Sequence, residues 1–129
     1  MQVPISARLL CCAEMIAPGA RVADIGTDHG YLPVYLLRAG RAASVLATDL
    51  RRMPLDNARK NAARFGLAGR IGFVQCDGLA GVSPRAVDTV VCAGMGSDLI
   101  CRIIGDAPWL RDAGYTLILQ PQGTVHDLR

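Results

Sequence analysis

Apolar and polar positions alternate in blocks along this chain of 129 residues. Short apolar runs typical of buried strands are each followed by a segment with helical spacing of apolar residues, and Gly or Pro closes most blocks. The pattern predicts strands at Arg21–Ile25, Ser44–Thr48, Arg70–Cys76, Val87–Ala93 and Tyr115–Leu119. It predicts helices at Pro4–Ala17, Gly30–Ala39, Leu55–Phe65 (opened by Pro54) and Asp98–Gly105, and the start of another at Thr124–Arg129.

This alternation determines the expected fold class. Strands that are apolar on both faces and are joined through helices form a buried parallel sheet with right-handed connections. We therefore expect an α/β, Rossmann-like domain with strand order 3-2-1-4-5 and helices on both faces. Because no linker or repeat interrupts the pattern, one domain should span residues 1–129.

Composition narrows the class of protein. Hydrophobic residues make up 51% of the chain and charged residues 19%, which is typical of a globular domain. No apolar run is long enough to cross a membrane, and the first residues lack the basic start of a signal peptide, so a cytoplasmic protein is expected. The formal charge is +3, and the Arg-rich composition suits phosphate contacts or reflects GC-rich coding equally well. The cysteines lack metal-ligand spacing, so reduced thiols and no metal site are expected.

The most informative segment is the glycine-flanked turn from Gly26 to Gly30, which separates a predicted strand from a helix. Helix N-termini at such turns present N–H groups to ligands, and in parallel sheets ligands bind at the carboxyl ends of the strands. The other strands end at Asp49, at Asp77–Gly78, at Gly94–Met95–Gly96 and at Gln120–Pro121. Four strand ends with Asp or Gly predict one shared pocket for a nucleoside cofactor.

Two of these carboxylates suit the two parts of a nucleoside. Asp49 is 23 residues past Gly26, where a carboxylate can accept hydrogen bonds from both ribose hydroxyls, although a helix cap or a solvated turn would also place an Asp there. Asp77 would accept from the exocyclic amine of adenine, and the alternative is an ordinary Asp-Gly turn.

The turn itself disfavours a dinucleotide. The G-x-G-x-x-G spacing is absent, and Asp28 would repel a pyrophosphate but not a sulfonium with an amino-acid tail. S-adenosylmethionine is thus favoured over NAD. Asp28 would lie near the reacting methyl group and orient an incoming nitrogen. Alternatively Asp28 caps the following helix and His29 packs against it.

The motifs Asp24-Ile25-Gly26-Thr27-Asp28-His29-Gly30-Tyr31-Leu32-Pro33, Ala47-Thr48-Asp49, Asp77-Gly78-Leu79, Ala93-Gly94-Met95-Gly96 and Leu119-Gln120-Pro121-Gln122 resemble those of the bacterial tRNA (adenine(22)-N1)-methyltransferases. The resemblance covers essentially the whole chain. It implies a class I methyltransferase core, S-adenosylmethionine as methyl donor and a tRNA adenine as acceptor. The residues predicted to contact the cofactor are Asp24, Gly26, Thr27, Asp28, His29, Gly30, Asp49, Leu50, Asp77, Gly78, Ala93, Gly94, Met95 and Gly96, with Asp28 as the catalytic residue.

The chain departs from the family in two places. Ser97 stands where family members usually carry a second glycine, and the family continues past Arg129 with two more strands and a helical RNA-binding segment. We therefore expect a fragment that carries the cofactor half of the fold. It is either a tRNA methyltransferase or a module that binds S-adenosylmethionine or its product S-adenosylhomocysteine without turnover. The exposed edge at the last predicted strand could be covered by a homodimer.

Overall fold

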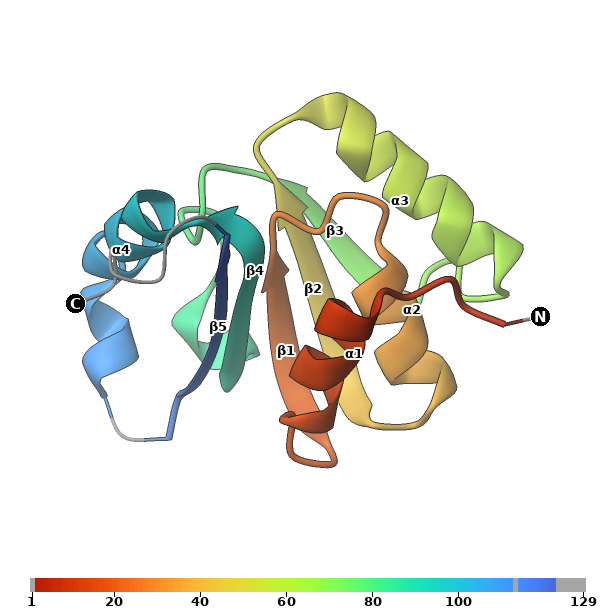
Figure 1. The fold of residues 1–129 in the computed structure, drawn as a ribbon, viewed down its shortest axis with the longest axis horizontal. Helices are drawn as coiled ribbons and strands as arrows, with labels where there is room; N and C mark the ends of the chain where they lie inside the picture. The colour runs from red at the N-terminus through yellow and green to blue at the C-terminus, as the bar shows by residue number, and fades with distance from the viewer. Residues whose placement is uncertain (1, 113, 123–129) are drawn as a thin grey trace.

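The computed structural model describes residues 2–112 and 114–122, and within them it shows a five-stranded sheet in the order β3-β2-β1-β4-β5 (Figure 1). Every neighbouring pair is parallel. The predicted fold class and strand order are confirmed. The strands are β1 (Ala20–Ile25), β2 (Ala42–Asp49), β3 (Ile71–Gln75), β4 (Thr89–Gly96) and β5 (Thr116–Gln122).

Helices cover both faces of the sheet, with α4 on the opposite side from α1, α2 and α3 (Figure 1). Side chains of β1 alternate between the two cores: Val22 packs with the first three helices, whereas Ala23 and Ile25 pack with α4. The helices are α1 (Ala7–Glu14), α2 (Tyr31–Arg38), α3 (Arg52–Arg64) and α4 (Ser97–Gly105), with short 3-10 helices η1 (Pro84–Ala86) and η2 (Pro108–Arg111).

Two helix boundaries differ from the prediction because of local capping. The first helix begins at Ala7 and not at Pro4, since the Ser6 hydroxyl accepts from the Leu9 N–H at 3.2 Å and sets the N-terminus. The third helix begins at Arg52, so Pro54 lies inside its first turn. Proline is tolerated there because an N–H in the first turn has no partner within the helix.

The fourth strand is longer than predicted, and this changes how the Gly94–Met95–Gly96 segment is described. The prediction places the strand at Val87–Ala93 with this segment at its end, but the segment belongs to β4, which shifts register between Ala93 and Met95. Gly94 has φ +71° and its N–H donates to the Gln120 side-chain oxygen at 3.0 Å. Such a bulge bends a strand at the rim of a sheet. The fifth strand likewise continues past its predicted end, to Gln122.

Two further observations concern other sequence predictions. Cys76 was expected inside the third strand, but β3 ends at Gln75 and Cys76 lies in the loop that follows. No helix among the described residues is long and apolar enough to cross a membrane. The predicted helix start at Thr124–Arg129 lies outside the described residues.

Candidate functional site

A cavity of about 380 Å³ opens at the carboxyl ends of the strands, where the sequence predicted a shared pocket. Residues from the ends of β1 and β2, from the loop after β3 and from the bulged end of β4 line it. The predicted site residues in this lining are Asp24, Gly26, Thr27, Asp28, Asp49, Leu50, Asp77, Gly78, Ala93, Gly94 and Met95. The tertiary structure thus brings together residues that are up to 71 positions apart along the chain.

Asp24 lies at the base of the cavity and is 4% exposed. Its Oδ2 accepts from the Thr27 hydroxyl at 2.8 Å. Burial raises the pKa of Asp24 to about 7, because the charged form loses its hydration; the Thr27 hydrogen bond acts in the opposite direction and the nearby Asp49 raises it further. This carboxyl group therefore changes charge near neutral pH.

Asp49 is the second buried carboxylate of the cavity, at 6% exposed. Its two oxygens are held by backbone: Oδ2 accepts from the Asp28 N–H at 3.3 Å and Oδ1 from the Arg51 N–H at 3.1 Å. The interpretation of Asp49 as a helix cap is wrong, because Arg51 is the N-cap of α3 and no side chain caps that helix. A carboxylate has about four acceptor sites, so two remain for a ligand.

Asp28 lies at the cavity with a 64% exposed side chain and an unusual backbone φ of +56°. Its carboxylate does not cap α2, since Gly30 is the N-cap and, among the described residues, no side chain makes a cap hydrogen bond to that helix. The capping alternative is therefore wrong. Asp28 faces solvent at the cavity and its Oδ2 lies 3.9 Å from the His29 Nε2.

Three predicted site residues, His29, Gly30 and Gly96, are not part of the cavity lining. The His29 ring packs against Tyr31 with 5.6 Å between centroids, and its backbone oxygen accepts from Asn61. Gly30 has φ +74°, and a Cβ there would lie 2.8 Å from the Ala58 Cβ. Its lack of a side chain therefore permits α2 and α3 to pack closely.

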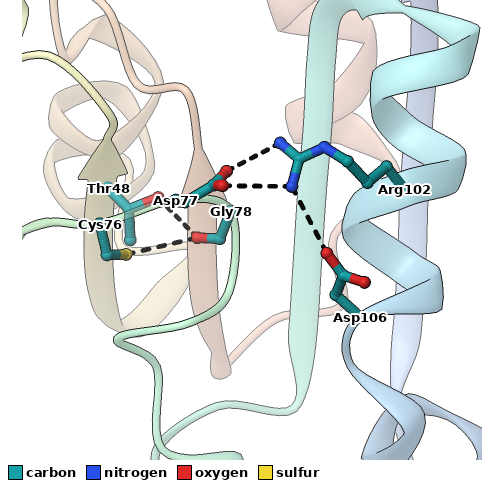
Figure 2. A network of polar contacts seen from close by, with 6 residues as sticks. All are labelled: Thr48, Cys76, Asp77, Gly78, Arg102 and Asp106. Carbon is teal, nitrogen blue, oxygen red and sulfur yellow. Dashed lines mark hydrogen bonds and ion pairs between the residues drawn. The ribbon is translucent and has the colours of Figure 1, made fainter.

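Asp77 comes from the loop after β3 and is bound by a residue that the sequence did not reveal. Arg102 of α4 donates from Nη2 to Asp77 Oδ1 at 2.8 Å and from Nη1 to Oδ2 at 3.2 Å. Figure 2 shows this pair, with Asp106 as a second carboxylate partner of the guanidinium. The hydrogen bond to Asp77 raises the pKa of Arg102.

The structure adds lining residues that sequence reasoning missed, among them Arg8, Thr48, Leu99, Arg102 and Ile103. Arg8, Leu99 and Arg102 come from helices that the pattern predicted, but periodicity does not say which helical residue reaches the sheet end. Thr48 could have been predicted as a lining residue from the sequence, since it carries a hydroxyl group and directly precedes Asp49 at the end of an apolar strand.

Candidate metal ligands were also compared with the structure. Within residues 2–112 and 114–122, no group of three or more His, Cys, Asp or Glu side chains is arranged to hold a metal ion. The five cysteines are free, and burial raises the pKa of Cys92 to about 12, which leaves it as a neutral core residue.

Comparison with known proteins identifies the family of this chain. A family described as a methyltransferase domain matches residues 5–129. The chain belongs to the methyltransferase domain family. It is also 35% identical over 120 residues to the tRNA (adenine(22)-N(1))-methyltransferase of Bacillus subtilis, covering 93% of this chain and 50% of that protein. The family resemblance inferred from the sequence motifs is confirmed.

Solved structures of related methyltransferases have the same fold as this chain. The chain superposes on the B. subtilis m1A22 tRNA methyltransferase TrmK with a TM-score of 0.87 at 35% identity, covering 93% of this chain and 51% of that one. It superposes on M. capricolum TrmK, solved with S-adenosyl-homocysteine, with a TM-score of 0.83 at 33% identity, covering 96% and 55%. The chain thus spans about half the length of these relatives.

Proposed function

We propose that this chain binds S-adenosyl-L-methionine in the cavity and acts in methyl transfer to N1 of an adenine in tRNA. The observation that supports this best is Asp49, a buried carboxylate at the end of β2 that lines the cavity while two backbone N–H groups hold it in place. A carboxylate fixed in this way, next to a glycine turn at the carboxyl ends of parallel strands, suits the hydroxyl pair of a ribose.

The cavity fits such a cofactor in size and chemistry. About 380 Å³ lies within the range of pockets that enclose ligands of this size. S-adenosyl-L-methionine supplies an electrophilic methyl group on a sulfonium. In the proposed arrangement Asp49 binds the ribose hydroxyls, Asp77 accepts from the adenine amine, and Gly26 and Gly94 let the backbone approach closely.

The remaining lining residues complete the proposed site. Asp24 and Thr27 form the base of the cavity beneath the turn, and Leu50 and Met95 supply apolar contacts. His29, Gly30 and Gly96 shape the surrounding backbone and packing. Asp28 is the proposed catalytic residue, since its exposed carboxylate lies at the cavity and can face an acceptor.

The acceptor chemistry fits a role for Asp28 in alignment. Adenine N1 attacks through an in-plane lone pair and has no proton to lose, so positioning matters more than a strong base. A nearby carboxylate stabilises the positive charge of the N1-methylated product. Because N1 lies on the pairing edge, the target nucleotide must be unpaired or flipped out.

The test measures binding and transfer separately. Calorimetry with S-adenosylhomocysteine should detect binding to the wild-type chain, and radiolabelled methyl transfer should modify unmodified tRNA at adenine. Asp28→Ala should lower the transfer rate by about 100-fold, as for other groups acting directly at a reacting centre, with cofactor affinity within twofold of wild type. Asp112→Ala is the matched control, because it removes an exposed carboxylate outside the cavity lining and should leave both the transfer rate and the cofactor affinity unchanged. An unchanged transfer rate in Asp28→Ala removes the proposed role of that residue.

The second candidate function is a cofactor-binding module without turnover. It is favoured by one fact: the chain spans only about half the length of its relatives. In that case residues 1–129 form a single cofactor-binding domain that requires further chain, a partner or a second copy. Binding of S-adenosylhomocysteine without methyl transfer to tRNA supports this candidate, and transfer by this chain excludes it.

We also propose a homodimer through the β5 edge, and a cytoplasmic location, which a tRNA acceptor implies. Among the described residues β5 is at one edge of the sheet, and Leu119 within it is 41% exposed. An edge strand presents unpaired backbone groups that a second copy can cover. Sedimentation velocity should then give a concentration-dependent dimer that Leu119→Lys weakens. A monomer at all concentrations contradicts this proposal.

A further inference from the structure

The cavity wall on the α4 side is closed by an ion pair between segments that are remote in the sheet. Arg102 belongs to α4, which packs against β4, whereas Asp77 follows β3. In the strand order β3-β2-β1-β4-β5, two other strands separate β3 from β4. The Asp77–Arg102 pair therefore bridges the ends of β2 and β1, and both of its residues line the cavity.

The geometry of this pair is bidentate. Two guanidinium nitrogens donate to the two Asp77 oxygens, at 2.8 Å and 3.2 Å. Asp106, one helical turn beyond Arg102, accepts at 3.4 Å from Nη1, the same nitrogen that donates to Asp77 Oδ2, and so further restrains the guanidinium (Figure 2). A planar, doubly held guanidinium fixes the plane of the carboxylate that it binds.

The backbone beside Asp77 is restrained as well. The Gly78 carbonyl accepts from the Thr48 hydroxyl at 3.5 Å and from the Cys76 thiol at 3.4 Å (Figure 2). A Cβ at Gly78 would lie 2.9 Å from the Ile103 side chain, so α4 approaches this loop as closely as a glycine allows. The close approach brings Arg102 within reach of Asp77.

The Asp77–Arg102 pair contributes little to the free energy of folding. The side chains of Arg102 and Asp77 are 45% and 52% exposed, and exposed ion pairs contribute little to folding. Its effect on acceptor geometry is larger. A carboxylate has about four acceptor sites, and a bidentate guanidinium occupies two, so two remain in a fixed direction at the cavity.

We propose that Arg102 is a positioning residue for base recognition: it holds the Asp77 carboxylate so that its remaining acceptor sites meet the exocyclic amine of the cofactor's adenine. The inference rests on the proposed function. It predicts that the chain prefers a cofactor with a 6-amino group over the same molecule with a 6-carbonyl group, because a carboxylate accepts from an amine and repels a carbonyl oxygen.

The experiment compares two product analogues that differ in the group at position 6 and, with it, in the proton that the 6-carbonyl ring carries on N1. Calorimetry measures the affinity of the wild-type chain for S-adenosylhomocysteine and for S-inosylhomocysteine, and the ratio of the two is the preference. Arg102→Ala should lower that preference about five- to tenfold, as expected when one charged hydrogen bond is misaligned. Arg102→Lys should recover part of it, since an ammonium keeps the charge but loses the fork.

The matched control is Arg52→Ala. Arg52 also pairs with an aspartate, Asp56, at 3.5 Å, but it does not line the cavity, so this variant should keep the wild-type preference. If Arg102→Ala weakens both analogues equally or raises the preference, Arg102 does not position Asp77 and the inference is wrong. Equal wild-type affinity for both analogues also overturns it and leaves the proposed function standing. If neither analogue binds, the proposed function itself fails, and the inference with it.

Discussion

The two walls of the cavity hold their carboxylates in different ways. On the β1–β2 side, Asp24 and Asp49 are buried and are held by a hydroxyl and by backbone N–H groups of the short loops that follow β1 and β2. On the β3–α4 side, Asp77 is half exposed and is held by the side chain of Arg102. The first wall contains Asp24, whose charge depends on pH near neutrality, whereas the second wall depends on an exposed ion pair and is sensitive to salt.

The largest expected effect is on the free energy of unfolding, in the variant Asp24→Asn, which changes a buried carboxylate of the first wall. A folded-state pKa of about 7, above the usual 3.8, means that Asp24 stabilises the fold most at low pH, and that stability is lost as pH rises from about 4 through 7. The variant has no charge to bury, so above pH 7 it should be more stable than wild type by about 2–4 kcal/mol. Thermal unfolding of both proteins at pH 4 and pH 8 measures this, and an equal difference at both pH values contradicts it.

The next effect is on the affinity for the ligand, in a variant of Asp49, the other buried carboxylate of the first wall. Asp49→Ala removes the proposed ribose acceptor and should weaken S-adenosylhomocysteine binding by about 30- to 100-fold, equivalent to about 2–3 kcal/mol for hydrogen bonds to a charged group. Asp112→Ala, at an exposed carboxylate outside the cavity lining, is the control. Calorimetry compares the two, and unchanged affinity in Asp49→Ala means that the ribose lies elsewhere.

Two glycines compare how tightly the chain is packed on the two sides of the site: Gly30 in the turn after β1, beside the cavity, and Gly78, which lines it. Gly30→Ala places a Cβ 2.8 Å from the Ala58 Cβ and 3.2 Å from its backbone Cα, whereas the Cβ of Gly78→Ala meets only side-chain atoms of Ile103, the nearest at 2.9 Å. We expect losses in unfolding free energy of about 3 kcal/mol for Gly30→Ala and about 1–2 kcal/mol for Gly78→Ala.

Gly66→Ala is the control for both, since Gly66 has φ +77° but no neighbour within 4 Å of the added Cβ. It should cost only about 1 kcal/mol, the penalty of the left-handed conformation. Urea denaturation gives all three values. Equal losses at Gly30 and Gly66 would mean that contact between α2 and α3 adds nothing.

The smallest expected effect is the salt dependence of the exposed Asp77–Arg102 pair. Raising the salt concentration from about 0.05 M to 0.5 M shortens the screening length and should lower the preference for S-adenosylhomocysteine over S-inosylhomocysteine by about twofold. Asp49 also lies 3.8 Å from the Arg51 Nε, but backbone N–H groups donate to both of its oxygens and the residue is buried, so the ribose contact should change less. A preference that is independent of salt would mean that geometry alone, without charge, aligns Asp77.

Most of the residues predicted for the site line the cavity, and the sequence could indicate them because its signals are local. The turn around Gly26, the aspartates at the strand ends and the order of the strands all follow from short patterns of apolar residues and glycines. The bulge at Gly94 was not predictable, since it depends on Gln120 of a strand 26 residues away. The missed cavity residues Arg8 and Arg102 come from helices whose surface pattern does not distinguish a residue at a cavity from one in solvent.

By itself, the sequence determined the parallel α/β fold, the strand order and the set of acidic strand ends, because hydrophobic periodicity and turn chemistry act over a few residues. Tertiary structure alone decided how those ends are held: the burial that raises the pKa of Asp24 to about 7, and the reach of Arg102 across two strands to Asp77. Both depend on desolvation and on distances between segments, which no local pattern contains.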